Sequence, residues 1–149
     1  MHPFDIKAAL LAKHAQHVVL IHFPIALFIA GVAFDFLAQW TKQRILAAAA
    51  YCNLVAAAAV TVPVLITGIL AWQWQLEGQR LKGILLMHLM LGCASSLLIW
   101  VVCFVHVRAK RKQGGVLPSY RLPVEAVAVV LVTLTGHLGG FLSGVNVSS

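Results

Sequence analysis

HVVLIHFPIALFIAGVAFDFLAQW, residues 17–40, is an apolar run long enough to cross a bilayer as a helix. Asp35 is the one residue in it with a full charge at neutral pH. Three further apolar runs follow, separated by short polar loops. We therefore expect spans over residues 18–40, 45–74, 83–107 and 122–142, and the sequence predicts an all-α, integral membrane four-helix bundle.

Composition supports this fold class. The chain has 149 residues, of which 61% are hydrophobic and only 10% are charged. Soluble domains carry about 25% charged residues. The four runs leave no room for a separate soluble part, so we expect a single transmembrane domain over residues 1–149. The first run is too long for the core of a cleavable signal peptide, and residues 5–17 could add a short interfacial helix before it.

The basic residues predict the orientation of the chain. The net charge is +7, but no recognisable nucleic-acid-binding module carries it, so nucleic acid is not expected as a partner. Four basic residues lie on the side of the termini, and seven lie on the side of the first and third loops: Lys42, Arg44, Arg108, Lys110, Arg111, Lys112 and Arg121. The positive-inside bias predicts that both termini face outward (N-out/C-out), in a multi-pass protein of the bacterial cytoplasmic (inner) membrane.

Four histidines fall at one depth of this predicted bundle. His17 and His22 begin the first span, His88 lies near the start of the third, and His137 lies near the end of the fourth. Because alternate spans run in opposite directions, all four lie in the outer part of the bundle, within about 10 Å of one another in depth. Gly136 and Gly140 are four residues apart, so they form a smooth helix face that admits another helix or a flat cofactor.

This arrangement predicts a haem site. A neutral imidazole can ligate iron, copper or zinc, and haem b can be held by two histidines on facing helices of a bundle. His17 and His22 point in directions about 140° apart on a straight helix, so they would not share one ligand position. We expect His22 and His88 to be the axial pair, with His137 and then His17 as the next candidate ligands, and Gly136 and Gly140 beside the cofactor.

The opening motif resembles that of a bacterial membrane family, domain of unknown function 2231. The resemblance rests on His17-Val-Val-Leu-Ile-His22-Phe-Pro-Ile-Ala-Leu and on Gly136-His-Leu-Gly-Gly140, with further matches at Asp35, Gly68 and His88. It implies a four-helix membrane protein, and because some relatives are joined to cytochrome c-like or Rieske-like modules, it implies a redox role. Val18 replaces a usual proline, and the continuation after Gly140 lacks a histidine that some relatives carry there.

We therefore expect a b-type haem electron-transfer subunit whose partners are the lipid bilayer and a redox or membrane-complex protein, with quinone as a candidate electron carrier. An electron-transfer or accessory subunit fits better than a stand-alone enzyme, because no hydrolase or nucleotide-binding motif is present. Two alternatives stay open. One is a cofactor-free membrane anchor or assembly subunit. The other is a copper-binding protein, since three cysteines lie in the spans and Met87 and Met90 flank His88.

Asp35 has two interpretations, because an ionisable group in a span is costly unless it is paired. It could pair with a loop cation such as Lys42 or Arg44, or it could handle protons.

Overall fold

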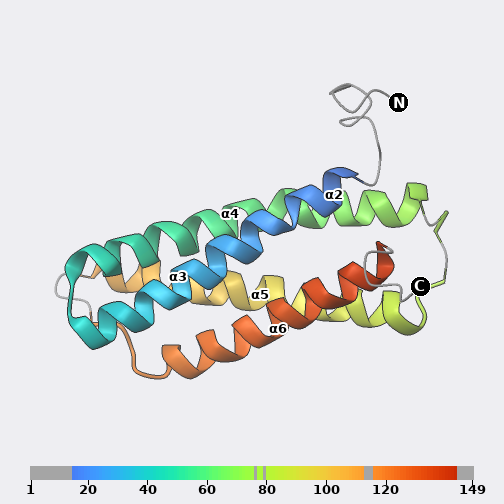
Figure 1. Ribbon diagram of the computed structural model, residues 1–149. Helices are drawn as coiled ribbons and strands as arrows, with labels where there is room; N and C mark the ends of the chain where they lie inside the picture. Colours follow the sequence, from blue (N-terminus) through green and yellow to red (C-terminus); the bar gives the residue numbers. More distant parts are fainter. Residues whose placement is uncertain (1–14, 76, 79, 113–115, 144–149) are drawn as a thin grey trace.

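The computed structural model describes residues 15–75, 77–78, 80–112 and 116–143, and these form helices joined by short loops (Figure 1). No strand occurs within these ranges. The helices are α2 (Ala15–Leu20), α3 (His22–Thr41), α4 (Arg44–Gln75), α5 (Gly83–Arg111) and α6 (Arg121–Leu142). The predicted all-α class is confirmed, and the long helices begin and end within a few residues of the predicted spans, except that α5 continues to Arg111.

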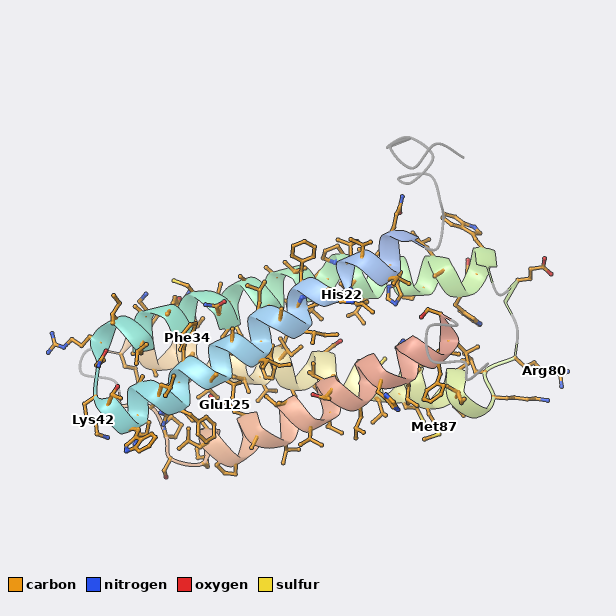
Figure 2. The ribbon with its side chains drawn as sticks, in the orientation of Figure 1. His22, Phe34, Lys42, Arg80, Met87 and Glu125 are labelled. Atoms are coloured by element: carbon orange, nitrogen blue, oxygen red, sulfur yellow. The ribbon has the colours of Figure 1, made fainter. Side chains whose placement is uncertain are left out.

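The four long helices form a bundle in which sequence neighbours pack side by side. α3 packs along α4 and α5 along α6, and the two pairs meet through α4 against α5 and α3 against α6. One end of the bundle, here called the basic end, holds the α3–α4 and α5–α6 connections, and Lys42 lies there (Figure 2). The other, the histidine end, is where α2 begins and α6 ends.

Most of the bundle surface is apolar, as a lipid-facing surface requires. Four helices are long and apolar enough to cross a membrane, and only 17–28% of the most apolar window of each is buried inside the bundle. Large side chains such as Leu97 and Phe104 are more than 60% exposed. In water such a surface would mark an aggregating protein, whereas in a bilayer it contacts acyl chains. The protein is therefore a multi-pass membrane protein.

The first span is broken near its start. Pro24 has no N–H to donate to the carbonyl of Leu20, so the helical hydrogen-bond ladder is interrupted there. The structure has a turn at Ile21, which separates α2 from α3. α2 contacts α4 as well as α3, and it carries His17. The interfacial helix expected over residues 5–17 falls almost wholly outside the described residues.

The centre of the bundle is held by small and medium apolar side chains from all four long helices, including Phe28, Leu54, Ile99 and Val132. Gly31 allows α3 and α4 to approach closely at this level. A Cβ on Gly31 would lie 2.9 Å from Leu54 Cγ and 3.2 Å from the Leu54 backbone nitrogen. Because Leu54 is fully buried, neither atom has room to move away.

We predict that Gly31→Ala lowers the free energy of unfolding by about 1–3 kcal/mol, the usual cost of overpacking a tight core. The measurement is thermal unfolding of the purified protein in detergent. Gly92→Ala is the matched control, because a Cβ there would meet only Thr135 Cγ2, at an ordinary 3.7 Å. Equal stability of the two variants would show that α3 and α4 are not in close contact at Gly31.

Candidate functional site

A cavity of about 270 Å³ lies between the helices at the histidine end. This volume is close to the lower bound of about 300 Å³ for small-molecule sites. Its walls come from α2, α3, α4, α5 and α6 and are mainly apolar, with residues such as Ile25, Leu85 and Val132. Two histidines, His17 of α2 and His88 of α5, are among the few polar residues of the wall. The cavity thus has the character of a ligand site with a small number of defined polar groups.

The ring of His17 is held against α4. Its Nδ1 lies 3.2 Å from Thr67 Oγ1, and that hydroxyl also donates toward the carbonyls of Pro63 and Val64. When the hydroxyl hydrogen points to one of these carbonyls, its oxygen accepts from the imidazole, and Nδ1 is then the protonated ring nitrogen. Gly68 makes room for the ring, because a Cβ there would lie 3.0 Å from His17 Cε1.

His88 is held against α6 in a similar manner. Its Nδ1 donates to the backbone carbonyl of Thr135, at 3.1 Å. A carbonyl can only accept, so Nε2 is again the nitrogen with the lone pair. Gly139 permits the contact, because a Cβ there would lie 3.2 Å from His88 Cε1. A hydrogen bond from one ring nitrogen to a carbonyl is the usual support of a metal-ligating histidine.

The other candidate residues lie differently. His22 is exposed and donates from Nδ1 to the Val18 carbonyl, at 2.7 Å, and it does not line the cavity. His137 is also exposed, with its ring edge-on to Phe141 at 5.0 Å between centroids. Gly136 lines the cavity, whereas Gly140 does not. Of the predicted axial pair, the structure brings His88 to the cavity together with His17 instead of His22.

The side chains that suggested copper do not gather at the cavity. Met87 and Met90 are more than half exposed, and neither lines it. Cys93 lines it, but Cys52 is exposed on α4 and Cys103 is buried near the middle of α5. The soft sulfur ligands that Cu(I) prefers are therefore dispersed.

A second polar group of residues is buried near the basic end. Asp35 of α3 forms an ion pair with Arg121 of α6, with 2.7 Å between Asp35 Oδ2 and Arg121 Nε. Arg121 also donates a hydrogen bond to Gln39 Oε1. His106 of α5 lies 2.9 Å from Glu125 of α6, atom Nε2 to Oε1. Asp35 thus pairs with a cation, which is one of its two interpretations, but the cation is Arg121 and not Lys42 or Arg44. α3 and α6 are neighbours, which the sequence alone does not reveal.

Sequence reasoning missed several of these residues. Gly139, Thr67 and Thr135 gave no signal, because their role depends on how each helix is rotated about its axis. Glu125 and His106 did give one, since each is an ionisable residue within or at the edge of an apolar run. Such residues usually face the bundle interior and pair with one another, as these two do.

The fold and the site together define a polytopic four-helix membrane protein with a cavity at one end and a buried polar cluster at the other. The chain belongs to the family described as "Predicted membrane protein (DUF2231)", whose model matches residues 13–146. The family resemblance is thereby confirmed. No curated protein and no solved structure matches the chain.

We predict that Arg121→Met destabilises the protein by about 3–5 kcal/mol, because it leaves the 2% exposed Asp35 carboxylate without its counter-charge. The double variant Arg121→Met, Asp35→Asn should recover part of this loss, since it removes both charges. The measurement is thermal unfolding in detergent. An Arg121→Met variant as stable as the unaltered protein would contradict the pairing of these two residues.

Proposed function

We propose that the protein is a b-type haem-binding membrane subunit that transfers electrons, with His17 and His88 as the axial ligands. The observation that carries this proposal is the matched support of the two rings. Each directs Nδ1 to a threonine oxygen on the adjacent helix, at 3.2 Å and 3.1 Å, and each lines the same cavity. With Nδ1 protonated, the Nε2 of each ring would be the nitrogen that ligates the iron.

The surroundings of the two rings suit a porphyrin. A mainly apolar wall would contact the macrocycle and lower the local dielectric, which would help to set the redox potential together with the axial ligands. Gly136 and Gly139 leave a stretch of α6 without side chains beside the cavity. The propionates would find cations at the histidine end, where exposed Arg80 and Lys82 flank the cavity-lining Leu81 in the sequence.

The positive-inside bias supports an outward-facing histidine end in a bacterial cytoplasmic membrane. Electrons would then pass between the haem and an outer-face redox protein or membrane quinone. The haem supplies the one-electron chemistry, and the protein supplies binding, orientation and burial. A cofactor-free membrane anchor is the competing function, and it is distinguished by the experiment that follows.

Replacement of the histidines one at a time tests the proposal. We predict that His17→Ala and His88→Ala each abolish the low-spin bis-histidine spectrum, because each removes one axial ligand. The measurement is an optical spectrum, oxidised and dithionite-reduced, of protein expressed with ample haem. His22→Ala and His137→Ala are the matched controls, since both side chains are exposed, and they should keep the spectrum. A spectrum lost in His22→Ala and kept in His17→Ala would restore the pairing expected from the sequence and overturn the one proposed here.

Gly139→Ala tests the support of His88 without removing a ligand. The new Cβ must displace the His88 ring by a few tenths of an ångström and weaken its hydrogen bond to Thr135. Loss of such support typically costs about 10–100-fold in affinity, so we predict weaker haem binding in this range by equilibrium titration. Gly140→Ala, at the adjacent glycine outside the cavity wall, should bind as the unaltered protein does. Equal affinities would show that Gly139 does not position His88.

A further inference from the structure

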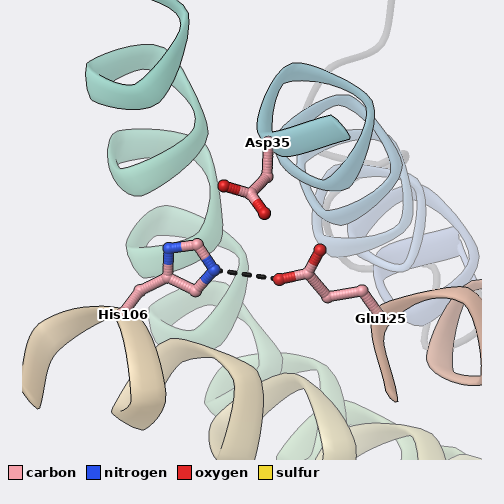
Figure 3. Close-up of side chains that lie close together, drawn as sticks. All are labelled: Asp35, His106 and Glu125. Carbon is pink, nitrogen blue, oxygen red and sulfur yellow. Dashed lines mark hydrogen bonds and ion pairs between the residues drawn. The ribbon is translucent and has the colours of Figure 1, made fainter. Parts of the chain in front are cut away.

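The buried polar cluster at the basic end has the donor set of a metal site. Asp35, His106 and Glu125 come from α3, α5 and α6 and point toward one another (Figure 3). One ligand atom of each lies within 4.8 Å of the other two, and all three residues are buried. Donors around an ion with bonds of about 2.2 Å stand about 3.1–4.4 Å apart, according to the angle between the bonds. The three donors therefore lie close to the spacing that a bound ion requires.

Glu125 gives an independent sign of a missing ligand. Its side chain is 0% exposed, and Oε1 is bonded to His106 while Oε2 has no hydrogen-bond partner among the described residues. A buried carboxylate oxygen without a partner is costly, because the protein interior does not replace the water it has lost. In Figure 3 the three side chains stand at the corners of a triangle, with the Glu125 carboxylate facing the other two, so an ion that bound both Glu125 oxygens would satisfy it.

The charges leave room for a cation. Asp35 and Glu125 supply two carboxylates, and Arg121, at 2.7 Å from Asp35, supplies one guanidinium. With Glu125 ionised and His106 neutral, one negative charge is left buried without a counter-charge. Either a proton in the His106–Glu125 hydrogen bond or a bound cation offsets it, and a divalent cation leaves one positive charge in its place. These two states exclude each other, because a ligating Nε2 cannot also hold the proton that bonds it to Glu125.

We propose that Asp35, His106 and Glu125 bind a divalent first-row transition ion of the Zn²⁺, Mn²⁺ or Fe²⁺ class. One imidazole with two carboxylates suits these ions, whereas Mg²⁺ and Ca²⁺ take oxygen ligands. Arg121 and Gln39 would support the site without touching the ion. Arg121 donates to Asp35 Oδ2 and to Gln39 Oε1, and this fixes the orientation of the Asp35 carboxylate. The ion would tie α3, α5 and α6 together at the basic end.

This site is distinct from the cavity between His17 and His88. His88 and His106 are 18 residues apart on α5, which corresponds to about 27 Å along the helix. The two sites share no residue. Metal binding at the basic end therefore does not depend on haem binding at the histidine end, and the two can be tested separately.

The test uses the full chain in detergent, stripped with a chelator and then equilibrated with Zn²⁺. We expect about one tightly bound Zn²⁺ per chain by elemental analysis, and a Kd at least about 100-fold weaker in Glu125→Gln, since loss of a direct ligand should exceed the effect of losing its support. Glu77→Gln, at an exposed loop carboxylate, and His88→Ala, in the cavity, should both retain the ion. Stripped protein that takes up no Zn²⁺, or equal Kd values for Glu125→Gln and the unaltered chain, would overturn the site.

A second measurement uses the unaltered chain, with His88→Ala as a control, and leaves the three ligands intact. Electron spin echo envelope modulation of bound Mn²⁺ should show coupling to the nitrogen of one imidazole, from His106, and this signal should persist in His88→Ala. Bound Mn²⁺ without nitrogen coupling, or with coupling lost in His88→Ala, would show that the ion is held elsewhere.

Discussion

A polar group inside a bilayer has no water to bond with, so it must find its partner within the protein. The structure meets much of this constraint with side-chain hydrogen bonds between neighbouring helices. Asp35 meets Arg121, His106 meets Glu125, and His17 and His88 meet threonine oxygens. Each of these bonds joins two helices, so the polar groups also determine how the helices are rotated about their axes. The apolar remainder of each helix is left to face lipid.

Close approach of the helices depends on the absence of side chains at a few positions. Gly31 brings α3 against Leu54 of α4, and Gly68 and Gly139 let two imidazole rings lie against helix surfaces. The break before Pro24 has the complementary effect, since it frees α2 to direct His17 across to α4. Glycine and proline thus shape the cavity and hold its two histidines at the wall.

Hydropathy predicted the helices well, because burial in lipid demands an apolar run of sufficient length wherever the chain crosses. Helix counting also brought four histidines to one depth. The rotation of each helix about its axis could not be predicted in this way. Successive residues of a helix point about 100° apart, so the depth of a residue does not tell which way its side chain faces. For that reason the sequence could not show that His17 and Gly139 line the cavity, whereas His22 and Gly140 do not. Nor could it identify Arg121 as the partner of Asp35, 86 residues away, because the α3–α6 contact arises only when the bundle assembles.

The central claim is that the cavity holds haem b between two histidines. The most direct test is the dithionite-reduced optical spectrum of the unaltered protein, purified in detergent after expression with ample haem, with a pyridine haemochrome assay for stoichiometry. The account predicts sharp reduced α and Soret bands and about one haem b per chain, as two axial histidines imply. A colourless preparation of correctly folded protein would contradict it and favour a membrane anchor without a cofactor.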